Sequence, residues 1–189
     1  MEGILKNILK KIRPLDFGAW VGSAKLLSQE QFTIVKEYDL NSKVSIGDLQ
    51  KLKRLIVRCG DLVVLPVSLG KLKELEELNV TSDTLRELPV SIGDLQKLKR
   101  LTVSCGDLAI FPVSLVNLKE LEELNVTSDT LREFPVSIVH LNKLKRLIIS
   151  CEVLAMLPVP LESLKQLEEL DVTSHVLWEL PVFQFSSGR

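Results

Sequence analysis

A proline recurs every 23 residues through most of this sequence. The six positions are Pro66, Pro89, Pro112, Pro135, Pro158 and Pro181. Leucine accounts for 37 of the 189 residues, which fits a lattice that repeats with the prolines. An unbroken period of this length is typical of stacked repeats, because one unit cannot bury its apolar face without neighbours. We therefore expect a solenoid.

Each unit joins a strand pattern to a short helical pattern. Leu101 and Val103 alternate with polar residues, and alternate residues of a strand share a face, so residues 100–104 are predicted to be a strand. Residues 54–58 and 77–81 occupy equivalent positions and should pair with it in parallel. After Pro89, apolar residues recur at a spacing of three, which favours a 3-10 or irregular helical segment. The pattern predicts an α/β solenoid.

A second period of 46 residues lies on top of the first. The phrase KLKRL begins at Lys51, Lys97 and Lys143, whereas ELEEL begins at Glu74 and Glu120, with the variant QLEEL at Gln166. The unit of duplication is therefore a pair of repeats, one basic and one acidic. Cys59, Cys105 and Cys151 share the 46-residue spacing. Two strand spacings are about 10 Å, which is too far for a disulfide, so three free thiols are expected.

The pattern L-x-x-L-x-V-x-x-x-x-L-x-x-L-P runs from about Leu52 to Pro181 and resembles the leucine-rich repeat family. The 23-residue length and the P-x-S-[IL]-G-x-L phrase are similar to its intracellular type. That type includes plant Ras-group-related proteins and the repeat domains of plant disease-resistance (NBS-LRR) proteins. The resemblance implies a horseshoe with a parallel sheet on the concave face and short 3-10 or irregular helical segments on the convex face.

One position departs from that family pattern. Many such repeats carry asparagine there, and its side chain bonds neighbouring loop backbones. This chain has other residues at the position, namely Gly60, Asp83, Gly106, Asp129, Glu152 and His175. A regular asparagine ladder is therefore not expected.

Both ends depart from the repeat. Residues 1–43 are predicted to form an N-terminal cap, residues 44–182 the repeats and residues 183–189 a tail. Apolar residues from Ile4 to Ile12 fall on one helical face, which suits a capping helix or, alternatively, a membrane-surface or partner helix. Phe32 and Ile34 match a degenerate first strand, although Ser28 and Gln31 also fit a helical capping box.

At the other end, either the chain is a fragment of a longer protein or aromatic residues shield the last coil. The aromatic candidates are Trp178, Phe183 and Phe185.

Composition excludes several classes of function. The net charge of −1 gives no general attraction for nucleic acid, and the residues between Met1 and Arg13 lack a signal-peptide core. No run of 18 apolar residues predicts a membrane span. The odd cysteine count favours a reducing, cytoplasmic setting.

Catalytic chemistry is not indicated. His140 and His175 lie 35 positions apart, and no nucleophile shares their register. The chain is expected to be no enzyme, with no catalytic residue, no cofactor and no metal.

The outward residues of the strands form columns. One column alternates in charge, through Arg54, Glu77, Arg100, Glu123, Arg146 and Glu169, and is interpreted as an ion-pair ladder or, alternatively, as part of a binding site. The other outward residues of the strands form two further columns, which give a mostly polar surface that suits a protein partner. The predicted partner-binding residues are Ile56, Arg58, Asn79, Thr81, Thr102, Ser104, Asn125, Thr127, Ile148, Ser150, Asp171 and Thr173.

The sequence thus favours a protein-interaction scaffold, with a role in signalling or plant defence implied by the resemblance. The alternative is the recognition domain of a larger enzyme, such as a ubiquitin-ligase effector or a kinase. The partner is expected to be a protein of unknown identity. The chain itself is expected to be a monomer, and head-to-tail association is the weaker possibility.

Overall fold

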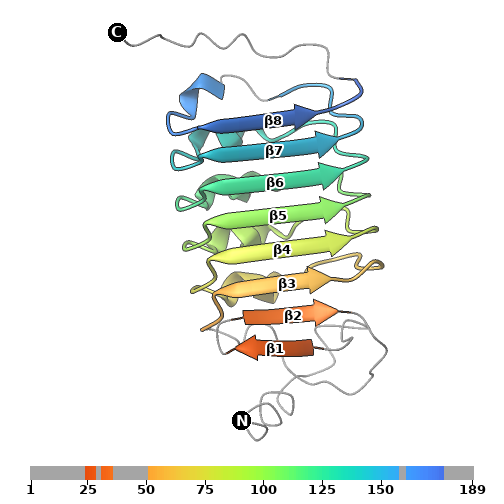
Figure 1. Cartoon of the computed structure of the whole chain (residues 1–189), viewed down its shortest axis with the longest axis vertical. Coiled ribbons are helices and arrows are strands. Elements are labelled where there is room, and N and C mark those ends of the chain that lie inside the picture. Colours follow the sequence, from red (N-terminus) through yellow and green to blue (C-terminus); the bar gives the residue numbers. More distant parts are fainter. Residues whose placement is uncertain (1–23, 29–30, 36–50, 158–160, 177–189) are drawn as a thin grey trace, which may run out of the picture.

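The computed structural model describes residues 24–28, 31–35, 51–157 and 161–176. Eight strands form one sheet in chain order (Figure 1). The strands are β1 (Ala24–Ser28), β2 (Gln31–Val35), β3 (Arg54–Arg58), β4 (Glu77–Ser82), β5 (Arg100–Cys105), β6 (Glu123–Ser128), β7 (Arg146–Cys151) and β8 (Glu169–Thr173). From β2 to β8 every pair is parallel, which confirms the predicted α/β solenoid.

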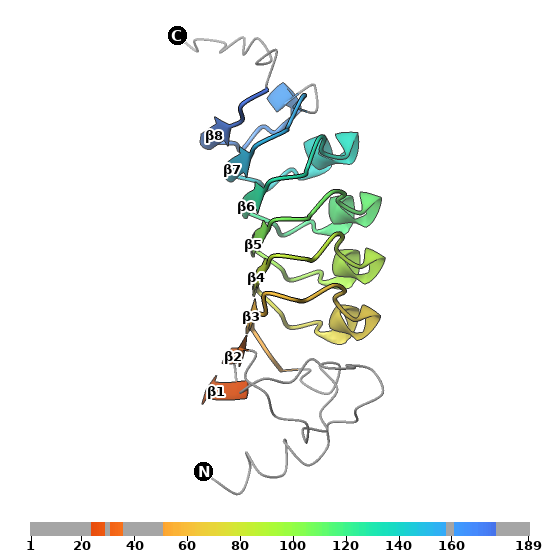
Figure 2. The ribbon, with the colours of Figure 1, turned by 90° about the vertical axis from the view of Figure 1, so that its right-hand side faces the viewer.

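Short 3-10 helices lie on the side opposite the sheet, one between each two successive strands from β3 to β8 (Figure 2). They are η3 (Val67–Lys71), η4 (Val90–Asp94), η5 (Val113–Asn117), η6 (Val136–His140) and η7 (Leu161–Ser163). The repeated proline stands immediately before helices η3–η6 with an extended backbone, as Pro89 does at φ −64° and ψ 147°. Its carbonyl accepts the first helical bond, from the N–H of Ile92 at 2.9 Å. Proline suits this place because the position needs no N–H.

The N-terminal strands confirm one prediction and add one feature. Phe32 lies in register with Leu55, and Ile34 with Val57, so β2 is a degenerate first repeat strand and not the alternative helix. β1 pairs antiparallel with β2, an edge strand that sequence analysis did not foresee. Only two residues separate β1 from β2, which is too short for a parallel crossover. The proposed helix at Ile4–Ile12 and the aromatic residues from Trp178 onward lie outside the described residues.

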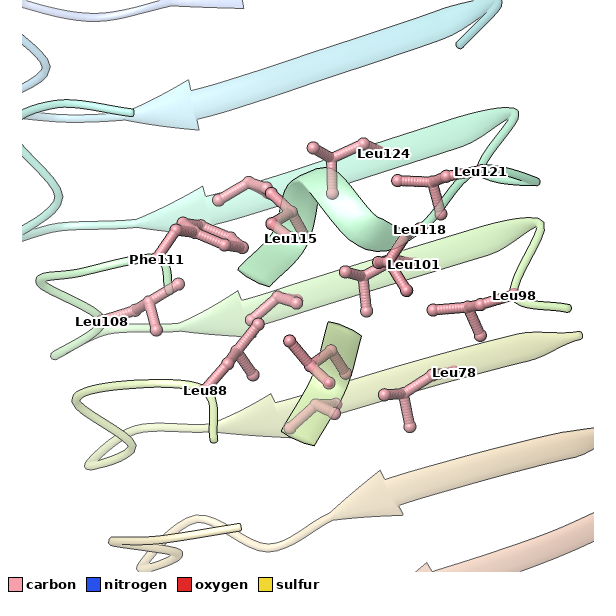
Figure 3. Packing of buried hydrophobic residues seen from close by; sticks show 14 of the residues in the cluster. Leu78, Leu88, Leu98, Leu101, Leu108, Phe111, Leu115, Leu118, Leu121 and Leu124 are labelled. Atoms are coloured by element: carbon pink, nitrogen blue, oxygen red, sulfur yellow. The ribbon is translucent and has the colours of Figure 1, made fainter. Parts of the chain in front are cut away.

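Leucines of adjacent coils stack to form the core. Leu101 lies between Leu78 and Leu124 of the neighbouring strands, and all three are at most 1% exposed (Figure 3). Phe111 and Phe134 replace leucine before the proline and stack with ring centroids 5.2 Å apart. No helix in the described part of the chain is long and apolar enough to cross a membrane.

Glycine in the P-x-S-[IL]-G phrase permits close contact between helices. A Cβ atom added at Gly70 would lie 2.7 Å from the carbonyl oxygen of Ser91, and one at Gly93 would lie 2.5 Å from that of Ser114. Real Cβ atoms do not approach so closely, so η3, η4 and η5 can stack tightly only because these positions lack side chains. Val116 and Val139 take the equivalent places in η5 and η6, which pack less closely on the helices that follow.

Buried serines take the place of the missing asparagine ladder. The Ser82 hydroxyl accepts the N–H groups of Thr84 and Leu85, each at 3.2 Å, and donates to the Leu62 carbonyl of the preceding coil at 2.9 Å. Ser128 repeats this arrangement on the Leu108 carbonyl at 2.7 Å. The turn is therefore closed by a hydroxyl one residue before the asparagine position. Cys59, Cys105 and Cys151 occupy the same position in the alternate coils and are buried.

We predict that Ser82→Ala lowers the free energy of unfolding by about 1–3 kcal/mol, because it leaves buried amide and carbonyl groups without a partner. Ser150→Ala is the matched control, since the Ser150 side chain is exposed and makes no hydrogen bond in the described structure. The measurement is the urea midpoint of both variants. Equal midpoints would contradict a structural role for the serine.

Candidate functional site

The strands present a continuous face on the side away from the core. Parallel pairing sets residues 23 positions apart side by side, so Asn79 lies next to Thr102, and Thr102 next to Asn125. The twelve predicted partner-binding residues all lie on this face of β3–β8, and none of them is buried. Figure 2 shows that the sheet curves so that this face is on its inner side, away from the 3-10 helices. We call it the concave face.

The concave face is organised as two columns. The amide column contains Ile56, Asn79, Thr102, Asn125, Ile148 and Asp171 in successive strands. The hydroxyl column contains Arg58, Thr81, Ser104, Thr127, Ser150 and Thr173. Within the described structure no hydrogen bond engages the side-chain amides of Asn79 and Asn125 or any side chain of the hydroxyl column. These donors and acceptors are therefore available to a partner.

Beside these columns runs the charged column that begins at Arg54. Arg54 Nε and Arg100 Nη2 each lie 2.7 Å from Glu77 Oε2. Arg146 Nε lies 2.7 Å from Glu169 Oε2, and its Nη1 lies 3.9 Å from Glu123 Oε2. The predicted alternation is confirmed by the register. The pairing is uneven, however, because Arg100 contacts Glu77 and forms no ion pair with Glu123 among the described residues.

Lysine–glutamate pairs extend the ladder beyond the strands. Lys99 Nζ lies 2.8 Å from Glu76 Oε2, and Lys145 Nζ lies 2.9 Å from Glu122 Oε2. Two further pairs, Lys97 with Glu74 and Lys143 with Glu120, are 2.7 Å long. In every case the acid precedes the base by one coil. These lysine–glutamate pairs thus join the coil of β4 to that of β5, and the coil of β6 to that of β7.

These contacts lower carboxylate pKa values. Burial raises the pKa of Glu77, but hydrogen bonds and positive charge from Arg100 and Arg54 outweigh it, so the pKa is lowered overall. A hydrogen bond from Lys99 lowers the pKa of Glu76, and one from Lys145 lowers that of Glu122. A lowered pKa keeps these carboxylates ionised at neutral pH, whereas a general acid needs a raised pKa.

The two histidines are exposed, whereas the three cysteines are buried. His140 is exposed on η6, where its Nδ1 lies 3.3 Å from the Ser137 carbonyl, and His175 is exposed in the turn after β8. Burial raises the pKa of the Cys105 and Cys151 thiols to about 11, so little thiolate is available at neutral pH. In the ranges that the structure describes, no three His, Cys, Asp or Glu side chains gather as a metal site.

A second surface was not singled out from the sequence. Large hydrophobic side chains are exposed in the segments that lead from the strand ends to the 3-10 helices and at the first residue of helices η3–η6. We call this surface the apolar flank; its residues are Val63, Val64, Val67, Val90, Ile110, Val113, Val136 and Met156. The signal was present in the sequence as the valine that follows each repeated proline.

A model of the leucine-rich repeat region matches residues 25–130. The chain therefore belongs to the leucine-rich repeat family, whose members are typically interaction modules. No curated protein matches the sequence.

Solved structures agree with this assignment. The plant peptide hormone receptor RGFR1 in complex with RGF2 is 25% identical with a TM-score of 0.56, over 69% of this chain and 22% of the receptor chain. A TDR receptor is 28% identical with a TM-score of 0.58, over 68% of this chain and 23% of that chain. The leucine-rich repeat domain of the type III effector XCV3220 (XopL) shares the fold at 23% identity and a TM-score of 0.52, over 66% of this chain and 54% of that domain. The chain thus spans less than a quarter of the length of the two receptor chains.

Reversal of one charge in the ladder should destabilise the sheet more than its removal does. Arg100→Glu opposes Glu77 with a like charge, so we expect it to lower stability by about 0.5–1 kcal/mol more than Arg100→Ala. The difference should shrink in high salt. Urea midpoints at low and high salt measure it, and equal midpoints for the two variants at low salt would reject the ladder as a structural element.

Stability should also depend on pH. The folded-state pKa of Glu77 is lowered from 4.5. The stabilisation from the ion pairs of Glu77 is therefore present above pH 4.5 and is lost as the pH falls through the folded-state pKa. We expect the difference in urea midpoint between the wild type and Glu77→Gln to be largest near neutral pH and to shrink from about pH 5 to about pH 3. A difference that stays constant over this range would show that the pairs do not stabilise the folded state.

Proposed function

We propose that the chain is a protein-recognition module that binds a partner protein on the concave face. The observation that carries the proposal is the set of unengaged polar side chains in the amide and hydroxyl columns. They stand on a sheet whose register is fixed from β2 to β8, so their positions are set before a partner arrives. Open faces with distributed polar groups suit protein partners better than small ligands.

The chemistry of the face also indicates how a partner is held. Asn79 and Asn125 stand two strands apart with Thr102 between them, so amide groups recur at a spacing of about 10 Å. Side-chain amides offer both donors and acceptors, which suits the main-chain groups of a partner segment. Ile56 and Ile148 are half-buried and add apolar contacts at either end of this row.

Signalling or immune recognition in a cytoplasmic setting is the biological role that we propose. The 23-residue repeat and the odd number of cysteines support the setting. The likeness to a plant peptide hormone receptor in complex with RGF2 supports recognition as the role. If the chain belongs to a larger enzyme, the same face serves as its recognition surface.

The test is binding of displayed protein fragments, selected on the wild-type protein and measured by fluorescence anisotropy. Thr102→Arg with Asn125→Arg blocks the concave face with two positive charges, and we expect affinity to fall by at least about tenfold. The matched control is Asn117→Arg with His140→Arg, which places the same residues on the exposed side of η5 and η6. If the control loses as much affinity as the concave-face variant, or if the latter loses none, the proposed site is wrong.

A further inference from the structure

The apolar flank gathers almost all of the exposed large hydrophobic side chains in the described residues. Nine such side chains are exposed, and eight of them lie on this flank, with Val176 the exception. Val67, Val90 and Val113 are 75%, 74% and 70% exposed, and they follow one another coil by coil. Exposed apolar residues that recur coil after coil mark an interaction site more often than scattered ones do.

The residues before each proline give the flank an alternating pattern. Two adjacent exposed or half-buried positions are apolar in one coil and an Arg–Glu pair in the next. The five successive pairs are Val63–Val64, Arg86–Glu87, Ala109–Ile110, Arg132–Glu133 and Ala155–Met156. Parallel bridges join Glu87 to Ile110 and Glu133 to Met156, so each charged pair is stacked in register with the apolar pair that follows it.

The four flank charges are not neutralised across coils. Arg86, Glu87, Arg132 and Glu133 are exposed and form no ion pair or side-chain hydrogen bond within the described structure. The cause is the alternation itself, since each charged layer has apolar layers as its neighbours. This contrasts with the charged column of the sheet, where every base lies in register with an acid. The flank therefore carries unpaired charges of both signs between apolar strips.

From this pattern we propose that the apolar flank binds a second copy of this chain. In a two-fold dimer with its axis parallel to the solenoid axis, each coil faces the same coil of the second copy, and the two positions of each pair are exchanged. Arg86 then faces Glu87 of the second copy, and Arg132 faces Glu133 of the second copy. The apolar layers face apolar layers, so Ile110 meets Ala109 of the second copy.

Charge complementarity selects this orientation. The alternative is a two-fold axis perpendicular to the solenoid axis. It reverses the order of the coils and does not exchange the two positions of each pair. Arg86 then faces Arg132 of the second copy, and Glu87 faces Glu133 of the second copy. Like charges then oppose one another in both charged layers, which disfavours that arrangement.

The dimer leaves the concave faces open, because the contact lies at the ends of the strands. Rotation about an axis parallel to the solenoid turns the two concave faces toward opposite sides of the dimer. A dimer of this kind presents two copies of the proposed recognition site, although its formation does not depend on what those sites bind. The five layers span about 20 Å at the spacing of a sheet.

The test is sedimentation equilibrium of the whole chain over a range of concentrations, with three variants. Arg86→Glu with Arg132→Glu opposes glutamates in both charged layers, and we expect the dimer dissociation constant to rise at least tenfold. Addition of Glu87→Arg and Glu133→Arg to the same protein exchanges the two columns and should restore dimerisation. Lys71→Glu with Lys119→Glu makes the same change in net charge at exposed lysines outside the flank and should leave dimerisation unchanged.

Each outcome bears on the proposal. A wild-type chain that is monomeric at every concentration overturns it, as does a dimer that is indifferent to the Arg86 and Arg132 reversals. Failure of the four-residue exchange to restore the dimer, with urea midpoints unchanged, overturns the proposed orientation. If the wild type is monomeric and Ile110→Asp abolishes binding of a selected fragment, the flank serves another protein and not a second copy. The concave-face variant Thr102→Arg with Asn125→Arg should dimerise normally, so the two proposals fail independently.

Discussion

Burial of leucine between adjacent coils is the constraint on which the structure depends. One coil encloses only part of its own apolar surface, and Leu101 is excluded from water because Leu78 and Leu124 lie on either side of it. The stacking fixes the strand register, and the register in turn sets which outward side chains become neighbours. The charged column and the unengaged amides of Asn79 and Asn125 both result from that geometry. The concave face is thus a consequence of the core and needs no rearrangement to form.

The two-coil period organises the surface as well as the sequence. Lysine–glutamate pairs join an acidic coil to the basic coil that follows it, as Glu76 joins Lys99, whereas Arg54 and Arg146 pair with the acidic coil that follows them. Backbone bonds on the flank link the same coils, from the Ala109 N–H to the Arg86 carbonyl at 3.0 Å and from the Ala155 N–H to the Arg132 carbonyl at 3.1 Å. Serine and cysteine alternate at the buried turn position with this period too. The repeating unit is therefore a pair of coils, one acidic and one basic.

Much of this architecture was predictable because the period is strict. The prolines and leucines predicted the strands, their parallel register and the helical segments, and the twelve concave-face residues were placed correctly on one surface. Their role in binding stays a prediction. The role of Ser82 was missed because its hydroxyl bonds to a carbonyl 20 residues earlier, which no local pattern indicates. β1 was missed because it lies outside the repeat, and the uneven ion pairs were missed because register permits two partners without choosing one.

The central claim is that a pre-formed concave face recognises a protein partner through its unengaged polar side chains. Nuclear magnetic resonance of the side-chain amide groups tests it directly, with a selected protein fragment as the ligand. The account predicts that the signals of Asn79 and Asn125 shift or broaden on addition of the fragment, while those of Asn117 and Asn142, which are exposed outside the sheet, stay unchanged. Shifts confined to Asn117 and Asn142 would contradict the account.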